Sequence, residues 1–338
     1  MKTQLPSSPP PVINMMLNKL HGRSVKNITV IIFIIIINFI IPPKPAAAQT
    51  VSLSIWPPIL EIMVKPGKSI TQVYKLTNLG NDTVIKAGIF PFEPNPDGQV
   101  LVSRTPSPIA DYFSLQNADL ELPTTFPLKA GATQELVLKI RVPVSAPEAD
   151  YYLTFLFESS DLGVITGTGS KTLGSIGANI LLTVSNTGQP TKSGLISQLS
   201  ASPCLFHGPI CLIDSFSPIK FTTQVTNTGA TRFKAIGQLE IYNTFNRKIS
   251  TLPFREDNVL ANSTRYLVSN TPGVKKSPTP GVEWVSVFPF GRYKTAAAIT
   301  PSDTTISLEK TLVFYVLPYK LIFLLFAITF AGYYYYHK

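Results

Sequence analysis

Two cysteines are the residues of this sequence best placed to react with one another. Cys204 and Cys211 are the only cysteines in the chain, and they enclose a short segment that contains Gly208-Pro209. Two thiols are too few to complete a structural zinc site, but in an exported protein they can form a disulfide. We therefore expect a Cys204–Cys211 disulfide, over the alternative of two free buried thiols.

Other chemistry lacks the side chains it needs. Of three histidines, His21 and His337 lie near the ends, which leaves His207 alone for a catalytic dyad or a multi-histidine metal site. The glycine-rich stretch 163–177 lacks the Gly-Lys-Ser/Thr of a phosphate-binding loop, so a hairpin is the better interpretation. We expect no catalytic residue, cofactor or metal. Ser-Lys or paired-carboxylate chemistry stays open, which keeps a membrane-tethered hydrolase as an alternative.

A repeat organises the rest of the chain. Residues 70–80 can be laid on residues 219–229 without a gap, and both segments end in Thr-Asn-x-Gly. The Asn and Gly positions tolerate positive φ, so the chain can reverse there. Leu76 and Val225 should occupy equivalent inward positions, with Lys75 and Thr226 facing outward. We interpret the two segments as copies of one β-sandwich unit.

Alternation of apolar and polar residues with a period of two predicts strands around these repeats. It is clearest over 135–142, 176–184 and 233–241, and 284–288 and 312–316 are expected as late strands. Asp150-Tyr151-Tyr152 is either a tyrosine corner or a pair of ordinary interior tyrosines. About seven such strands per unit favour an all-β chain of two tandem immunoglobulin-like β-sandwiches. We expect them at 49–187 and 195–317, joined by a linker at 188–194.

The sequences at the two ends of the chain predict export and attachment to the membrane. Residues 1–48 have the pattern of a secretory signal peptide with an N-terminal extension, cleaved between Ala48 and Gln49. An uncleaved anchor is the alternative. Residues 318–336 are expected as a transmembrane helix and 337–338 as a cytoplasmic tail, and a buried terminal helix or strand is the alternative. The prediction is a single-pass cell-membrane protein with its ectodomain outside.

The net charge of +10 does not indicate a nucleic-acid partner. Five basic residues and no acidic ones lie within 1–48, so half of the excess belongs to the predicted targeting segment. A signal peptide needs such a positive region before its apolar run. We expect no nucleic-acid binding.

Three features resemble a known family: Val64-Lys-Pro-Gly-Lys, the Thr-Asn-x-Gly turn that follows, and the Asp97-Gly98 loop. They resemble the N-terminal domain of WxL-interacting proteins of Gram-positive bacteria. That resemblance implies a signal peptide, two Ig-like domains and one C-terminal span, with peptidoglycan and protein contacts divided between the domains. The first unit also resembles the immunoglobulin variant of pilus chaperones.

The expected function is therefore non-catalytic binding at the cell envelope. The partner would be a cell-wall polymer or a secreted or surface protein, and an envelope or pilus assembly chaperone is the alternative. Sheet edges can accept a strand from another chain. Because loops often carry function, the segments 162–177 and 270–281 are further candidates for partner contact.

Overall fold

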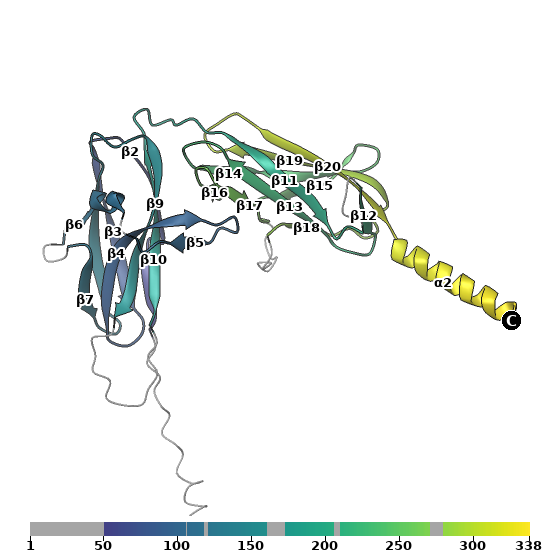
Figure 1. Ribbon diagram of the computed structural model, residues 1–338, viewed down its shortest axis with the longest axis horizontal. Coiled ribbons are helices and arrows are strands. Elements are labelled where there is room, and N and C mark those ends of the chain that lie inside the picture. The colour runs from purple at the N-terminus through teal and green to yellow at the C-terminus, as the bar shows by residue number, and fades with distance from the viewer. Residues whose placement is uncertain (1–50, 106, 118–120, 161–172, 206–209, 271–279) are drawn as a thin grey trace, which may run out of the picture. The chain divides into compact units, whose positions relative to one another are not determined.

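The computed structural model describes residues 51–105, 107–117, 121–160, 173–205, 210–270 and 280–338 (Figure 1). Apart from the short 3-10 helix η1 (Pro108–Tyr112) and the helix α2 (Tyr319–Tyr336), the regular structure is all β. The strands that precede residue 187 are β1 (Leu53–Trp56), β2 (Ile59–Val64), β3 (Ser69–Asn78), β4 (Thr83–Pro94), β5 (Val100–Val102), β6 (Phe113–Leu115), β7 (Thr124–Leu128), β8 (Thr133–Arg141), β9 (Ala149–Ser160) and β10 (Ser175–Val184). Those that follow are β11 (Gly194–Ser202), β12 (Cys211–Asp214), β13 (Ile219–Asn227), β14 (Phe233–Tyr242), β15 (Lys248–Pro253), β16 (Asp257–Val259), β17 (Thr264–Tyr266), β18 (Val282–Trp284), β19 (Gly291–Pro301) and β20 (Leu308–Leu317).

The sheets confirm the repeat, because both halves have one topology. The first sandwich pairs a sheet of order β1-β3-β8-β6 with one of order β2-β10-β9-β4-β5, in which β7 also joins β4. The second pairs β11-β13-β17, with β18 on β13, and β12-β20-β19-β14-β15, with β16 on β14. In both, the second strand runs parallel to the last one, β2 beside β10 and β12 beside β20. This is an immunoglobulin-like arrangement.

Each sandwich encloses its own apolar core. Leu76 of β3 and Val225 of β13 are fully buried in equivalent places, as the repeat predicts. Lys75 points outward and forms an ion pair with Glu135 of β8 at 3.0 Å. Thr226 is half-buried opposite Thr264 of β17. Burial of the alternating residues supplies the main favourable free energy of folding.

The two Thr-Asn-x-Gly turns are held by asparagine side chains, and their glycines do not adopt the positive φ that the sequence suggested. Neither Gly80 nor Gly229 is among the described glycines with positive φ. Instead, the asparagine before each is buried and its amide satisfies the backbone. Asn78 donates to the carbonyls of Asn81 and Leu128 and accepts from Gly80 N–H, at 2.7, 3.0 and 2.9 Å. Asn227 repeats the pattern with Thr231, Val259 and Gly229, at 2.9, 3.0 and 2.8 Å.

The expected strand over 284–288 is wrong beyond its first residue. The pairing of β18 with β13 ends at Ile219 opposite Trp284. From there to the start of β19 no described strand pairs with the chain, and Val285, Val287 and Phe288 are exposed in a loop. The alternation of apolar residues therefore does not indicate burial here.

Helix α2 forms at the residues where a transmembrane helix was expected. None of its side chains is buried, and its apolar residues lie on all its sides. Within the part of the chain that the structure describes, however, no helix has the combination of length and apolar character needed to cross a membrane. The expected span at 318–336 is thus not supported.

Candidate binding surfaces

A buried carboxylate lies at the junction of the two sandwiches, which belong to one compact unit, Thr50–Lys338. The side chain of Asp150, at the start of β9, is fully buried and accepts bonds from Thr183 Oγ1 at 2.6 Å and Tyr152 OH at 2.8 Å. From the second sandwich, Arg232 donates its backbone N–H at 2.6 Å. The Arg232 guanidinium lies 3.8 Å from the carboxylate and also bonds to the Thr183 hydroxyl. The buried Asp150 carboxylate thus has both the hydrogen-bond donors and the opposite charge that a buried ionised group requires.

Tyr152 extends this contact. Burial and the adjacent Asp150 raise the pKa of its hydroxyl, which stays neutral, donates to Asp150 and accepts from Ala261 N–H at 2.7 Å. Beside it, Phe92 and Leu181 of the first sandwich pack with Leu260 of the second.

Tyr151, which precedes Tyr152 in the chain, donates a hydrogen bond to the Pro147 carbonyl at 3.3 Å. This is the bond of a tyrosine corner.

A second set of ion pairs surrounds a cavity of about 280 Å³ at the junction. Lys234 lies 3.0 Å from Glu61, and Lys192 lies 2.6 Å from Asp303. Burial raises the pKa of Glu61, but bonds from Asn258 and Lys234 outweigh it and leave the pKa below its ordinary value. Each of the basic side chains that line this cavity therefore has a carboxylate partner. We interpret the junction as a structural joint between the sandwiches.

The joint was not foreseen from the sequence. Its charged residues come from β2, β9, the segment 188–194 and the second sandwich, and no local pattern connects them. Among the described residues, no group of three or more His, Cys, Asp or Glu could hold a metal ion.

An open sheet edge lies on β10 of the first sandwich. On its outer side, β2 pairs only with Asn179–Val184, so no described strand covers residues 175–178. Asn179 N–H points to this side, since it donates to the Pro58 carbonyl at 3.0 Å. Because strand residues alternate in direction, the N–H and C=O groups of Ser175 and Gly177 point outward too.

A cavity of about 300 Å³ adjoins this edge, lined by residues 51–53 and 174–176. It lies where β1 of one sheet approaches β10 of the other. Gly177 is needed for packing, because a Cβ atom there would come within 2.5 Å of the Thr154 methyl group. We call residues 175–178 with this cavity the β10 edge.

The corresponding edge of the second sandwich carries an inward-pointing lysine, although β12 pairs only with Phe314–Leu317 and no described strand covers residues 308–313 on that side. Lys310 of β20 lies in line with Leu308 and Leu312, which pack on the core. Its ammonium group donates to the carbonyls of Ile196 and Ser197 in β11, at 3.1 and 2.7 Å. An inward-pointing lysine is one way in which proteins block strand addition at an edge. The two copies of the unit thus differ at the same place.

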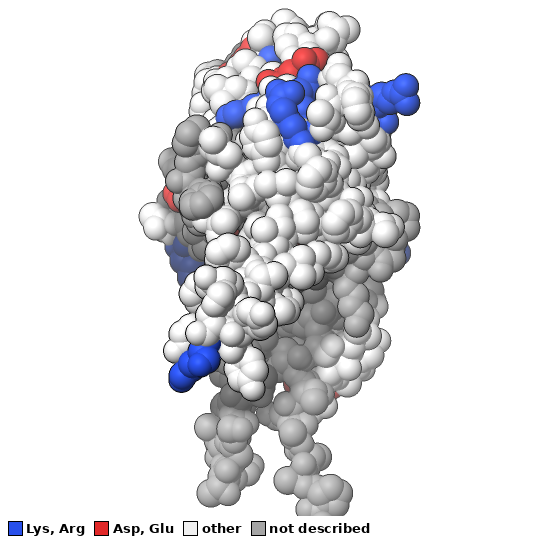
Figure 2. Space-filling model, turned by 90° about the vertical axis from the view of Figure 1, so that its right-hand side faces the viewer, with Lys and Arg blue, Asp and Glu red and all other residues white. Residues whose placement is uncertain are grey.

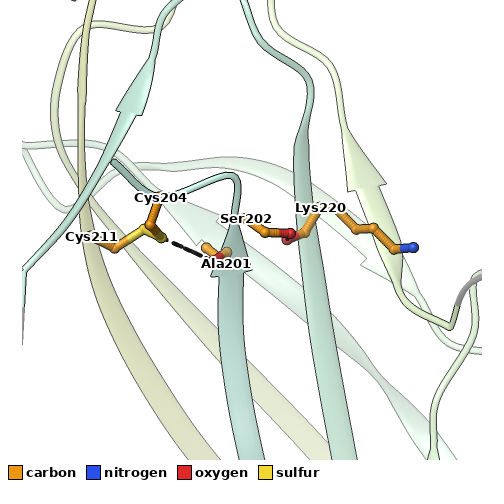
Figure 3. The surroundings of a disulfide bond; sticks show 5 residues. All are labelled: Ala201, Ser202, Cys204, Cys211 and Lys220. Atoms are coloured by element: carbon orange, nitrogen blue, oxygen red, sulfur yellow. Dashed lines mark hydrogen bonds between the residues drawn. A yellow bond between two sulfur atoms is a disulfide. The ribbon is translucent and has the colours of Figure 1, made fainter. Parts of the chain in front are cut away.

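The expected disulfide is present between Cys204 and Cys211, whose Cα atoms are 5.1 Å apart (Figure 3). It joins the segment after β11, in one sheet, to the first residue of β12, in the other. Cys204 Sγ lies 3.0 Å from the Ala201 carbonyl oxygen. The bond thereby fixes the crossover between the two sheets.

Other predicted positions fall outside the described residues. Ala48 and Gln49, the predicted cleavage site, are among them, as is His207. The predicted contact segment 162–177 is described only from Leu173 onward, and 270–281 only at its two ends.

No protein-family model matches this chain. No curated protein matches it either. Among solved structures, it is similar to the Class 5 fimbriae chaperone CfaA, with 15% identity, a TM-score of 0.34, and 79% of this chain and 100% of that one covered. It is also similar to the E. coli chaperone DraB, at 11% identity and a TM-score of 0.36, covering 78% of this chain and 97% of that one.

A further match is a chain from the Salmonella enterica SafA pilin in complex with the SafB chaperone, at 11% identity and a TM-score of 0.34, covering 79% of this chain and 99% of that one. The names of these matches are those of pilus chaperones and a pilin, the class named in the second resemblance. They give no support to a WxL-interacting protein. At such identities and scores, they carry no argument about the fold or the function of this chain.

Proposed function

We propose that this protein is a non-enzymatic protein of the cell envelope that binds an extended segment of a partner protein at the β10 edge, as an assembly chaperone does. One observation carries this proposal. The outward backbone groups of Ser175 and Gly177 face no described strand, while the equivalent edge of the second sandwich carries Lys310, whose side chain points inward to β11. Export by the segment 1–48 and attachment to the membrane by the C-terminal segment belong to the same proposal.

The edge offers what an added strand needs. An incoming segment would pair with two N–H and two C=O groups, which gives affinity without sequence specificity. One of its side chains could then enter the adjoining cavity of about 300 Å³ and provide specificity. Strand addition requires a peptide backbone, so these features favour a protein partner over a cell-wall polymer.

The joint between the sandwiches supports the same role. With Asp150, Arg232 and Tyr152 bonded across it, the second sandwich restrains the strand that carries the edge, because Thr183 of β10 belongs to the network. An edge that is ordered before binding loses less conformational entropy on binding.

The test is a pair of substitutions at one position. Ser175→Pro removes the outward N–H and leaves the bonds to β9 in place, whereas Ser175→Thr keeps the N–H. Full-length protein with an affinity tag should recover its partner from the host envelope as wild type and as Ser175→Thr, and should lose most of it as Ser175→Pro. The unfolding temperatures of both variants should match.

Equal recovery by both variants would contradict the assignment of the edge. Hydrolysis of a peptide, glycan or lipid by the purified full-length chain, without any bound partner, would favour the tethered hydrolase instead.

A further inference from the structure

One end of the second sandwich exposes an unusual number of large apolar side chains. They lie in the turns between β12 and β13, β14 and β15, and β18 and β19. Val287 is fully exposed, and Phe245 and Val285 are 83% and 75% exposed. The complete set, which we call the apolar end, is Phe216, Phe245, Val285, Val287, Phe288 and Phe290.

Strand registers place these turns together. The parallel strands β12 and β20 end side by side, with Asp214 opposite Leu317. At the start of β19, Arg292 pairs with Tyr315 of β20, and the end of β14 lies beside it. The rings of Phe216 and Phe288, from two different turns, are 5.5 Å apart. The six side chains therefore form one surface.

Helix α2 leaves the sandwich at this same end, directly after β20 (Figure 1). Its first turn is fixed to the sandwich: Lys320 N–H donates to buried Asp214 at 3.3 Å, and Lys320 Nζ lies 3.4 Å from Ser217 Oγ. Because α2 is apolar on all sides, one protein groove would cover only part of it. A medium that is apolar in every direction would cover it fully.

The charges near the apolar end are mainly basic. Arg247 and Arg292 are exposed in or beside its turns, and Lys320 is exposed at the base of α2. Two acidic residues lie nearby: buried Asp214, whose carboxylate is 3.9 Å from Lys320 Nζ, and Glu283, which lies opposite Lys220 in the β13–β18 pair. On the face shown in Figure 2, charged side chains are few, and most of them lie toward the top of the view.

We propose that the apolar end docks on an anionic lipid bilayer. The six apolar side chains would lie at the level of the headgroups, where aromatic residues are favoured, and the basic side chains would contact lipid phosphates. Helix α2 enters the acyl region beside them, and the docking does not require it to cross the bilayer. This role is independent of the β10 edge.

The test uses the disulfide, because it leaves the chain without a free thiol. Val287→Cys and Ile306→Cys are each labelled with an environment-sensitive fluorophore in the full chain. Ile306 is a matched control: it is 57% exposed, and it lies in the turn between β19 and β20 at the opposite end. Vesicles contain phosphatidylcholine alone or mixed equally with phosphatidylglycerol.

With the anionic vesicles, emission of the Val287→Cys label should shift to the blue and gain intensity severalfold, while the Ile306→Cys label stays unchanged. Replacing both Arg247 and Arg292 by Glu should weaken binding to anionic vesicles about tenfold or more. A Val287→Cys label that stays in water while the chain binds vesicles would overturn the docking. So would a blue shift that needs no vesicles and grows with protein concentration, because the end would then dock on a second copy. Equal shifts on neutral vesicles would overturn the anionic assignment.

Discussion

The two sandwiches of this chain share one strand order and differ where the chain crosses from one sheet to the other. In the first, β1 passes to β2 through Pro57-Pro58. In the second, the chain between β11 and β12 is longer, and the Cys204–Cys211 disulfide closes it. No described strand covers residues 175–178 of β10 at the edge beside the crossover, and the equivalent edge at β20 carries the inward-pointing Lys310. The two copies of the unit thus differ at the same place, the crossover between the sheets and the edge beside it.

This difference assigns separate roles to the copies. The first has an edge that no described strand covers, with a cavity beside it, which suits strand addition. The second has a disulfide at its crossover, an inward-pointing lysine at its edge and an apolar end from which α2 departs. Binding is accordingly proposed for the first sandwich and attachment for the second.

Core substitutions should have the largest effect and should separate the copies. Leu76→Asp or Val225→Asp buries an unpaired charge, so its own sandwich should lose more than about 4 kcal/mol of unfolding free energy. Trp56 and Trp284, one in each sandwich, allow each to be followed by fluorescence when the other tryptophan is replaced by Phe.

Lys75→Gln is the control for the first sandwich, because Lys75 is exposed and its surface ion pair should contribute less than about 1 kcal/mol. Equal losses for Lys75→Gln and Leu76→Asp would mean that the assigned register is wrong.

Replacing the buried asparagines tests whether the copies are equivalent. Asn78→Ala and Asn227→Ala each leave three backbone groups without their side-chain partner, which should cost about 2–4 kcal/mol. Chemical denaturation should show similar losses in the two sandwiches. A large loss in one and none in the other would contradict the shared role of the turn.

Loss of the disulfide should affect the second sandwich alone. On the chain-entropy model, Cys204→Ala with Cys211→Ala should cost roughly 2–3 kcal/mol. The fluorescence of Trp284 should report this loss, while that of Trp56 should not. Thiol labelling of the unreduced, unfolded wild type checks the premise, and two labelled cysteines would refute it.

The smallest effect concerns the joint and depends on pH. The pKa of Glu61 lies below its ordinary 4.5, so the interaction with Lys234 and Asn258 stabilises the folded chain above that pH and is lost as the pH falls through the lowered pKa. Glu61→Gln should flatten this part of the stability profile, measured as unfolding temperature against pH. Exposed Glu121→Gln should leave it unchanged, and a profile altered equally by both would exclude a special role for Glu61.

Local patterns predicted much of this molecule. The periodicity of two located the core positions around Leu76 and Val225, and cysteine spacing gave the disulfide. The pattern failed at 285–288, because alternation shows which residues are apolar but not whether a strand is available to pair with them. The sequence prediction also attributed the two Thr-Asn-x-Gly turns to positive φ, whereas the buried amide of the asparagine holds each turn.

The β10 edge, the joint around Asp150 and the bonds of Lys310 to β11 could not be predicted in this way. Each depends on residues far apart in the sequence, such as Asp150 with Arg232 or Lys310 with Ile196. An open edge is moreover defined by a partner strand that stops early, and a single strand's own residues carry no sign of that.

The most direct test of the account compares the two edges by photocrosslinking in living cells of the host. A photoreactive residue is placed at Ser175 on the β10 edge or at Glu309, which is exposed on the equivalent strand β20. We predict that Ser175 crosslinks to an extended segment of a protein partner, identified by mass spectrometry, and that Glu309 yields no such product. Crosslinking to the same partner at both sites, or only at Glu309, would contradict the assignment of binding to the first sandwich.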